Sequence, residues 1–208
     1  MAAFGFLIYP DLEEMDLVGP WEVITVWGMN YRGPDKVVTI AEKLEPLVCA
    51  KGLTLVPDFT FENHPGLDYL LVPGGKGSRT EINNKILINF IAVQAERCKA
   101  MLSVCTGALL FEKAGLLKGK KATTHWNSKS TLAEADGVSV LDKRFVRDGD
   151  VWTSAGVSAG VDMALAFVAE TAGNEVAGNV QQFMEYYPQQ KIYSRQSVLP
   201  SYVDKVND

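Results

Sequence analysis

The sequence contains few cysteines, and they are not spaced for a metal site or a disulfide framework. Among 208 residues only Cys49, Cys98 and Cys105 occur, and no two of them form a CxxC pair. Structural zinc sites and disulfide-stapled secreted domains depend on such spacings. The sequence therefore predicts no metal centre and no disulfide, and it favours a reducing, cytoplasmic compartment.

The sequence also lacks long apolar runs, an excess of basic over acidic residues and a phosphate-binding loop. No apolar stretch approaches the ~20 residues of a membrane span, and the start, MAAFGFLIYPDLEE, lacks the basic region of a signal peptide. The net charge of -5 and the pI of about 5.1 argue against a nucleic-acid surface. The stretch PGGKGSRT matches neither a Walker loop nor GxGxxG, so nucleotide binding is not expected. We expect a cytoplasmic protein without membrane or nucleic-acid partners.

The sequence does contain alternating strand and helix patterns, which predict one α/β domain over residues 1–208. The apolar content of 47% is enough for a full core. Apolar and alternating runs predict strands at 3–8, 36–41, 44–48, 53–56, 69–72, 101–104, 138–141, 145–147 and 151–153. Helical spacing predicts helices at 21–27, 84–97, 108–117, 127–135, 157–172 and 175–185. Strands apolar on both faces indicate a central, mostly parallel sheet sandwiched by helices.

Two segments need separate expectations. Pro20 suits the first turn of a helix, so the helix at 21–27 is expected to begin there. The tail from Tyr187 carries Gln, Ser and Pro. We expect it to be an extended arm that lies over the surface or on a partner.

The central feature is Cys105, which directly follows the apolar run 101–104. Thr106 and Gly107 come next, and helical spacing then begins. This strand–turn–helix pattern is the geometry of a nucleophile elbow, although the full GxSxG pattern is absent. A helix amino terminus beside the thiol is expected to lower its pKa. Two interpretations stay open: a catalytic or redox-active thiol, or a small buried packing residue.

Other candidate residues are expected at the same edge of the sheet. Asp16 follows the first strand, in the loop or at the entrance of the next helix. Gly74 and Gly75 form a sharp turn after the strand at 69–72, and such turns expose backbone N–H groups. The carboxyl ends of parallel strands are where open α/β sheets bind ligands. We therefore expect Asp16, this turn and Cys105 to form one site.

Four further charged or titratable positions have less specific signals. His125 could activate a thiol as its base, or it could be a structural histidine at a strand end. Asp162 is either a buried, hydrogen-bonded acid or a part of the site, and the structural role is favoured. Glu13 and Glu14 are expected to be solvated surface charges.

Four segments carry a family resemblance that spans nearly the whole chain. They are DLVGP at Asp16, LLVPGG at 70–75, SVCTGALLFEKAGLLKGKKATTHW at 103–126 and TSAGVSAGVDMALAFV at 153–168. Together they resemble the ThiJ/PfpI superfamily, which implies a flavodoxin-like, class I glutamine amidotransferase-like fold. The pairing of DLxGP with SVCTG resembles the isocyanide hydratase branch. Similar blocks occur in AraC-type regulators, which add a helix-turn-helix domain. We expect no such domain here, because the sequence is acidic and leaves no room for one before Asp208.

The resemblance implies an enzyme that adds water to an isocyanide to give an N-substituted formamide. Cys105 would be the nucleophile that forms a thioimidate, and Asp16 would be the general acid/base. The other residues that the resemblance places at the site are Gly75 and Thr106 in an anion pocket, Gly74 and Val157 in the substrate pocket, and His125 in a secondary role. It implies no metal or organic cofactor, a small-molecule substrate and a two-fold homodimer.

Other functions remain open at this point. Relatives in the superfamily include cysteine-dependent amidases, glyoxalases and deglycases, and a non-enzymatic redox-sensing or ligand-binding role is a further alternative. The chain also departs from the hydratase-like pattern EYxPxPPF. It reads EYYPQQKIY at 185–193, which puts the substrate in question if this arm closes a pocket.

Overall fold

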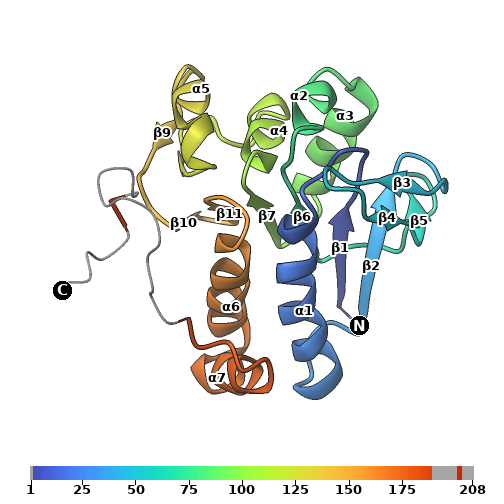
Figure 1. Ribbon diagram of the computed structural model, residues 1–208, viewed down its shortest axis with the longest axis vertical. Helices are drawn as coiled ribbons and strands as arrows, with labels where there is room; N and C mark the ends of the chain where they lie inside the picture. The colour runs from blue at the N-terminus through green and yellow to red at the C-terminus, as the bar shows by residue number, and fades with distance from the viewer. Residues whose placement is uncertain (1, 189–200, 203–208) are drawn as a thin grey trace.

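Seven strands form one central sheet in the computed structural model, which describes residues 2–188 and 201–202 (Figure 1). In spatial order they are β10 (Phe145–Asp148), β11 (Val151–Ser154), β7 (Ala100–Val104), β6 (Tyr69–Val72), β1 (Ala3–Leu7), β2 (Lys36–Ala41) and β5 (Phe59–Thr60). Every neighbouring pair is parallel except β10 with β11. The prediction of a mostly parallel sheet is therefore confirmed.

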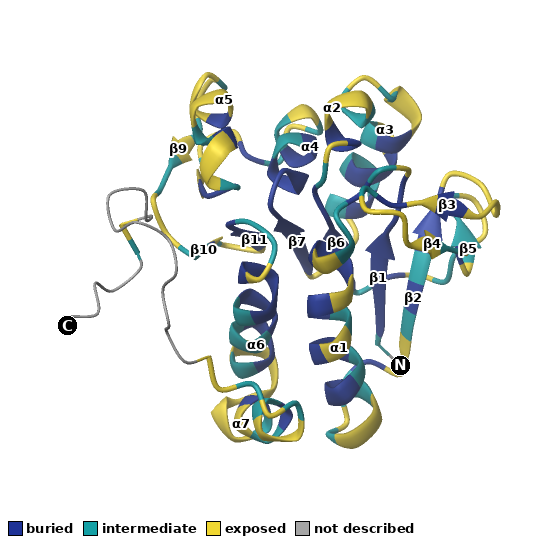
Figure 2. Cartoon of the chain, in the orientation of Figure 1, coloured by how far each residue is buried: buried dark blue, intermediate teal, exposed yellow. Residues whose placement is uncertain are grey.

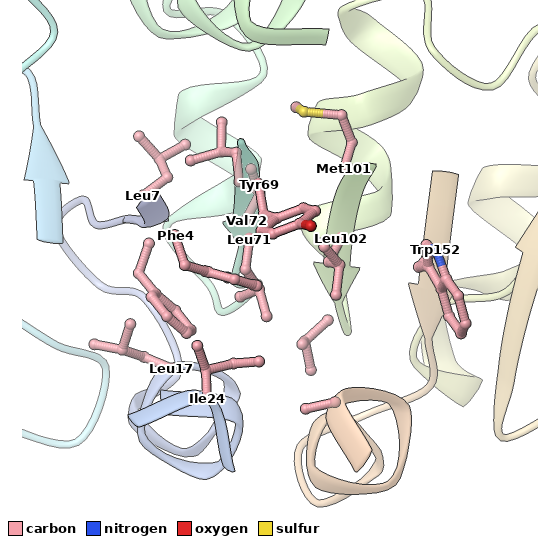
Figure 3. Close-up of a cluster of buried hydrophobic side chains, with 14 of the residues drawn as sticks. Phe4, Leu7, Leu17, Ile24, Tyr69, Leu71, Val72, Met101, Leu102 and Trp152 are labelled. Carbon is pink, nitrogen blue, oxygen red and sulfur yellow. The ribbon is translucent and has the colours of Figure 1, made fainter. Parts of the chain in front are cut away.

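Helices cover both faces of this sheet, as Figures 1 and 3 show. On one side lie α1 (Glu14–Asn30), α6 (Ala159–Ala172) and α7 (Asn174–Phe183). On the other lie α2 (Ser78–Glu81), α3 (Lys85–Ala95) and α4 (Gly107–Lys113). A 3-10 turn (Trp126–Ser128) leads into α5 (Lys129–Ala133). None of the helices in the described part of the chain is long and apolar enough to cross a membrane.

The core fills the space between the sheet and both helical layers. All residues of β1, β6, β7 and β11 are buried, as expected for parallel strands covered on both faces. Figure 3 shows Phe4 of β1 close to Ile24 of α1. Figure 2 shows exposed residues gathered on the outer helix faces and the loops. The residues at the carboxyl ends of the central strands are therefore held by a well-packed core.

Helix α1 begins at Glu14, so the predicted start near Pro20 is wrong. Pro20 lies inside the helix, where it cannot donate the usual hydrogen bond to the carbonyl of Asp16. Close packing accounts for the proline in this position. A methyl group added at Gly160 would lie 2.9 Å from Pro20 Cγ. This contact brings the first turns of α1 and α6 side by side.

The remaining differences concern short elements. The predicted hairpin is confirmed as β3 (Leu47–Val48) and β4 (Thr54–Leu55), which pair antiparallel outside the main sheet. β8 (Lys121–Ala122) pairs with β9 (Ser139–Val140) in another small sheet. The patterns did not predict α2, β5 or β8, none of which is longer than four residues. The expected arm begins at the described Tyr187, but 189–200 and 203–208 lie outside the described residues.

Candidate active site

Cys105 lies at the turn between β7 and α4, and its backbone is strained. Its φ is +56°, a left-handed conformation that non-glycine residues rarely adopt. Three hydrogen bonds hold the residue in place. Its N–H donates to the Ser154 carbonyl at 3.2 Å and to the Ala155 carbonyl at 3.1 Å, and its own carbonyl accepts the Thr124 hydroxyl at 2.7 Å. The surrounding structure thus over-determines this conformation, as is common where strain serves a function.

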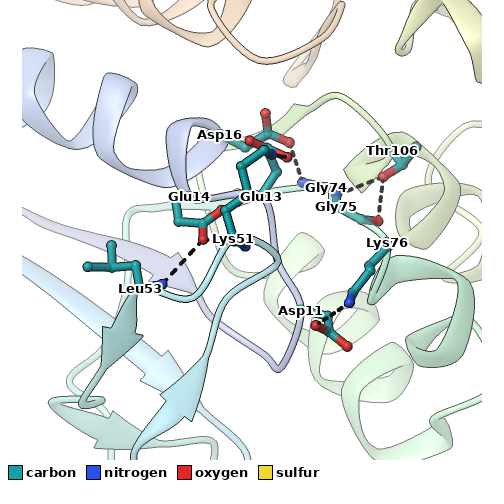
Figure 4. Close-up of polar contacts among 10 residues, drawn as sticks. All are labelled: Asp11, Glu13, Glu14, Asp16, Lys51, Leu53, Gly74, Gly75, Lys76 and Thr106. Atoms are coloured by element: carbon teal, nitrogen blue, oxygen red, sulfur yellow. Dashed lines mark hydrogen bonds and ion pairs between the residues drawn. The ribbon is translucent and has the colours of Figure 1, made fainter.

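Asp16 is fully buried on the first turn of α1. Its Oδ2 atom accepts the Gly74 N–H at 2.9 Å, as Figure 4 shows. Its Oδ1 atom is also buried and has no hydrogen-bond partner among the described residues. A buried carboxyl oxygen without a partner is costly, so it indicates a place for a proton or a ligand. Asp16 is the only acidic residue among those described that is buried.

Cys105 and Asp16 influence each other's ionisation. Burial raises the pKa of Asp16 to about 7, and the Gly74 hydrogen bond offsets part of that effect. Burial raises the pKa of the Cys105 thiol to about 12, and the nearby Asp16 charge adds to the rise. The expected lowering of the thiol pKa is therefore wrong. The seven-residue helix α4 does not outweigh the loss of water around a sulfur atom that is almost fully enclosed.

Backbone N–H groups face the pair from two turns. Those of Thr106 and Val157 lower the pKa of Cys105, and that of Val157 also lowers the pKa of Asp16. Val157 has φ of +48° and lies just before α6. The position expected for Val157 at the pocket wall thus brings its N–H close enough to lower the pKa of both side chains, although it forms no hydrogen bond with either of them among the described residues.

The Gly74–Gly75 turn is bonded to Thr106 (Figure 4). The Gly75 N–H donates to Thr106 Oγ1 at 2.9 Å, and Ser78 Oγ donates to the same oxygen at 2.9 Å. The Gly75 N–H is thus already used, and it is not a free donor for a developing anion in this structure. Among the expected anion-pocket groups, the Thr106 N–H is the one that faces the sulfur. Gly74 instead holds Asp16.

Substituting Gly74 with alanine is expected to destabilise the protein by about 1–3 kcal/mol. The added Cβ would lie 2.4 Å from the Thr106 nitrogen and 2.6 Å from Thr106 Oγ1, so the turn would have to move. Urea unfolding followed by circular dichroism measures the change. Gly66→Ala is the matched control, since its Cβ would meet nothing within 4 Å. Equal stability of the two variants would contradict the close approach.

His125 lies at the rim of the site and is not bonded to Cys105. Its Nδ1 atom accepts the Asn127 N–H at 3.3 Å, and its ring packs on Gly156, where an added Cβ would lie 2.2 Å from Cδ2. Burial and the charge of Arg79 lower the pKa of His125, so the ring is neutral at pH 7. No hydrogen bond among the described residues supports a Cys–His dyad.

Glu13 and Glu14 are not free surface charges, which corrects the expectation for both. Glu13 forms an ion pair with Lys51 of the β3–β4 turn, and its side chain is only 17% exposed. Glu14 Oε1 accepts the Lys51 N–H at 2.6 Å. Figure 4 shows both carboxylates between Asp16 and this turn. The hairpin is thereby anchored beside the site, through contacts that no local pattern could have indicated.

Asp162 is hydrogen-bonded as expected, but it is not buried, because its side chain is 24% exposed. Its Oδ2 atom accepts Arg144 Nε at 2.6 Å, and the Tyr186 hydroxyl donates to Oδ1 at 3.2 Å. Arg144 also reaches Ser158 Oγ at 3.3 Å. This cluster braces the segment from Ala155 to α6. Among the described residues, no group of three or more His, Cys, Asp or Glu could hold a metal ion.

One separate cavity of about 280 Å³ lies near the ends of β1 and β2. Tyr9, Glu42, Glu81 and Asn84 are among the residues that line it. Neither Cys105 nor Asp16 does, so we do not assign this cavity to the candidate site.

The fold and site together define a class: flavodoxin-like α/β proteins of the class I glutamine amidotransferase-like type, with a cysteine at the turn after a central strand. The chain belongs to the DJ-1/PfpI family, whose sequence model matches residues 4–170. This finding confirms the family resemblance and the fold that it implied.

Individual relatives agree with this membership. An isonitrile hydratase from Pseudomonas putida is 40% identical over 185 residues, which cover 88% of this chain and 78% of the relative. The regulator GbdR of Pseudomonas aeruginosa is 29% identical over 65% of this chain, but only 37% of its own length is covered. A crystal structure of a ThiJ/PfpI family protein from Pseudomonas syringae superposes with a TM-score of 0.85, at 34% identity, and covers 92% of this chain and 78% of that one.

Proposed function

We propose that the protein is an isocyanide (isonitrile) hydratase that converts R–N≡C and water into the formamide R–NH–CHO. One observation carries the proposal: the buried Asp16 has a partnerless oxygen beside Cys105, and its pKa is about 7. A carboxyl group that titrates near neutrality can both give and take protons. The 40% identity to an isonitrile hydratase supports the same reaction.

In the first step the thiol of Cys105 adds across the terminal carbon of the isocyanide. Above pH 7 the proton rests on sulfur and the charge on Asp16 in this proposal, because the pKa of Asp16 is about 7 and that of the thiol is about 12. Asp16 takes that proton as the sulfur attacks and delivers it to the same carbon. The S–H bond breaks, C–S and C–H bonds form, and the product is the thioimidate R–N=CH–S–Cys105. Asp16 is again a carboxylate.

In the second step water releases the product. Asp16 takes a proton from water as the oxygen attacks the thioimidate carbon, and it passes that proton to the nitrogen. The tetrahedral R–NH–CH(OH)–S then collapses: the C–S bond breaks, and the hydroxyl proton passes through Asp16 to the sulfur, so that the thiol re-forms and R–NH–CHO is released. The N–H groups of Thr106 and Val157 face the sulfur and would stabilise its charge as it leaves.

The purified protein is expected to convert a simple alkyl isocyanide, with a distinctive pH dependence. Because the reactive form needs the Asp16 carboxylate, kcat/KM should be level above pH 8. It should fall about tenfold per unit as pH drops through the Asp16 pKa of about 7. The thiol pKa of about 12 leaves no second limb below pH 10. Loss of the isocyanide infrared band and formamide detection by mass spectrometry measure the rate.

Two outcomes would oppose this assignment. Wild-type protein that leaves isocyanides unchanged would favour the alternatives, a glyoxalase or amidase type of enzyme or a ligand-binding protein. A strong dependence on His125, with Asp16→Asn still active, would favour a histidine-activated thiol. The infrared assay applied to His125→Ala and Asp16→Asn distinguishes these cases, because neither side chain takes part in the hydrogen bonds that hold the Cys105 backbone.

The small-molecule substrate follows from this proposal, and the two-fold homodimer and cytoplasmic location remain proposals beside it. The exposed apolar side chains of Met15 and Val18 lie on the first turns of α1, next to Asp16. A second copy that covers them would enclose the site. Light scattering measures the mass in solution.

A further inference from the structure

Tyr9 is a buried phenol just beyond β1. Only 2% of the residue is exposed, and its hydroxyl donates to the Pro73 carbonyl at 2.7 Å. Burial, followed by the charge of Asp16, raises the pKa of Tyr9 well above its usual value. The hydroxyl therefore keeps its proton, and remains a donor, throughout the working pH range.

The carbonyl that accepts this bond belongs to the same peptide group as the N–H that holds Asp16. The Pro73 carbonyl and the Gly74 N–H are the two ends of one trans peptide. At its other end, the Gly74 N–H donates to Asp16 Oδ2 at 2.9 Å. The phenol, the peptide and the carboxylate thus form one continuous chain of hydrogen bonds, with Tyr9 and Asp16 on opposite sides of the peptide.

Such a chain has a defined electrostatic direction. A donor on the carbonyl oxygen draws electrons away from the peptide nitrogen, which makes the N–H a stronger donor. A stronger N–H favours the ionised carboxylate, because hydrogen bonds to a charged acceptor are the strong ones. The effect opposes the burial of Asp16. The hydrogen bond from Tyr9 also fixes the plane of the Pro73–Gly74 peptide, and this plane sets the direction from which the Gly74 N–H holds Asp16 Oδ2.

We propose that Tyr9 is a positioning residue that keeps Asp16 ionised and oriented for proton transfer through the Pro73–Gly74 peptide. The role in proton transfer rests on the proposed function, but the test of the link between Tyr9 and Asp16 does not. Other charged groups near Asp16 are Glu13, Lys51 of the β3–β4 turn and the Cys105 thiol. The Glu13 N–H donates to the Gly74 carbonyl, on the next peptide, and Glu81 and Cys105 are the other charged or titratable groups near Tyr9. Among the described residues, no side chain of Glu13, Lys51 or Cys105 is hydrogen-bonded to the Pro73 carbonyl or the Gly74 N–H, so a change at Tyr9 can be read separately.

Substituting Tyr9 with phenylalanine is expected to raise the pKa of Asp16 by about 0.3–0.5 units, a two- to threefold change in its ionisation constant. The size follows from 10–30% strengthening per bond in a hydrogen-bonded chain. Carbon-13 NMR of carboxyl-labelled aspartate follows the titration, and the Asp16→Asn variant assigns the signal. No substrate is needed, so the result is independent of whether the protein hydrates isocyanides.

The matched control is Tyr69→Phe. Tyr69 is also a buried tyrosine, but it packs on Phe4 and Phe167 and is not bonded to the Gly74 peptide. Its substitution should leave the Asp16 titration unchanged. If Tyr9→Phe is an active hydratase, the acid limb of its kcat/KM profile should move up by the same amount. A merely structural loss would lower the rate without moving that limb.

A second variant guards against a folding defect in Tyr9→Phe. Site-specific 3-fluorotyrosine at position 9 keeps the ring and makes the hydroxyl a stronger donor. It should lower the Asp16 pKa, which is the opposite direction. The proposal is overturned if the Asp16 titration stays within 0.1 unit of wild type in the fluorinated protein, or if Tyr9→Phe and Tyr69→Phe titrate alike. An inactive wild type with both shifts present would reject only the hydratase function.

Discussion

Replacing Cys105 with alanine is expected to abolish isocyanide hydration, with a loss of about 10³-fold or more in kcat. The sulfur makes the bond that carries the substrate, and Cys105 is among the groups that shift the pKa of Asp16. The fold should survive, because the hydrogen bonds that hold residue 105 use only its backbone. The infrared assay gives the rate, and circular dichroism checks that the variant is folded.

Cys98→Ala is the control for the loss of a buried thiol. Cys98 is also buried, and burial raises its pKa to about 12 as well, but its sulfur donates a hydrogen bond to the Leu67 carbonyl and it is not among the groups that act on Asp16. That variant should keep full activity. The test is sharpened by mass spectrometry of acid-quenched protein during turnover. A mass increase equal to one isocyanide should appear on the peptide that contains Cys105. Hydration by Cys105→Ala would refute the covalent route.

Local patterns were sufficient for the parts of this site that depend on short segments. The apolar run before Cys105 and the Thr106–Gly107 pair that follows it predict a strand, a tight turn and a helix. The turn is tight because a methyl group at Gly107 would lie 2.3 Å from the Val72 carbonyl. The sequence also predicts Asp16 at the same edge, because the carboxyl ends of parallel strands lie together. Local patterns and this rule are therefore enough to predict that Cys105 and Asp16 lie close to each other.

Long-range contacts account for what the patterns missed. Glu14 binds a backbone N–H of Lys51, 37 residues later in the chain, and nothing near Glu14 indicates this. The thiol pKa is raised because the whole fold encloses the sulfur, whereas the local helix end favours the opposite direction. The Gly75 N–H is used by Thr106, a residue from the next strand's turn. Sequence patterns predict where the functional side chains and turns lie. Their pKa values, and which of their hydrogen-bond donors and acceptors stay unused, depend on the packing of the whole fold.

Replacing Asp16 with asparagine is expected to abolish catalysis and, at the same time, to remove a pH-dependent instability. Asparagine keeps the shape and can still accept the Gly74 N–H, but it cannot carry a proton between sulfur and carbon. The folded-state pKa of Asp16, about 7, lies above the unfolded value of about 3.9. Between these values the folded protein binds more protons than the unfolded chain. The unfolding free energy of the wild type should therefore decrease as pH rises from 4 to 7.

The total loss from this one group is roughly 4 kcal/mol by pH 8, from three units at about 1.36 kcal/mol each. The advantage of Asp16→Asn over wild type should therefore grow by a similar amount between pH 4 and pH 8, whatever constant offset the buried amide adds. Urea unfolding at five pH values measures the difference. Asp68→Asn provides a control of opposite sign, because Lys99 lowers the Asp68 pKa and wild-type stability is gained as that group ionises. Parallel stability curves for wild type and Asp16→Asn would show that Asp16 ionises without cost. The partnerless Oδ1 could then not be the proton carrier, because a carboxylate free of that cost would have its usual low pKa and would hold no proton near neutral pH.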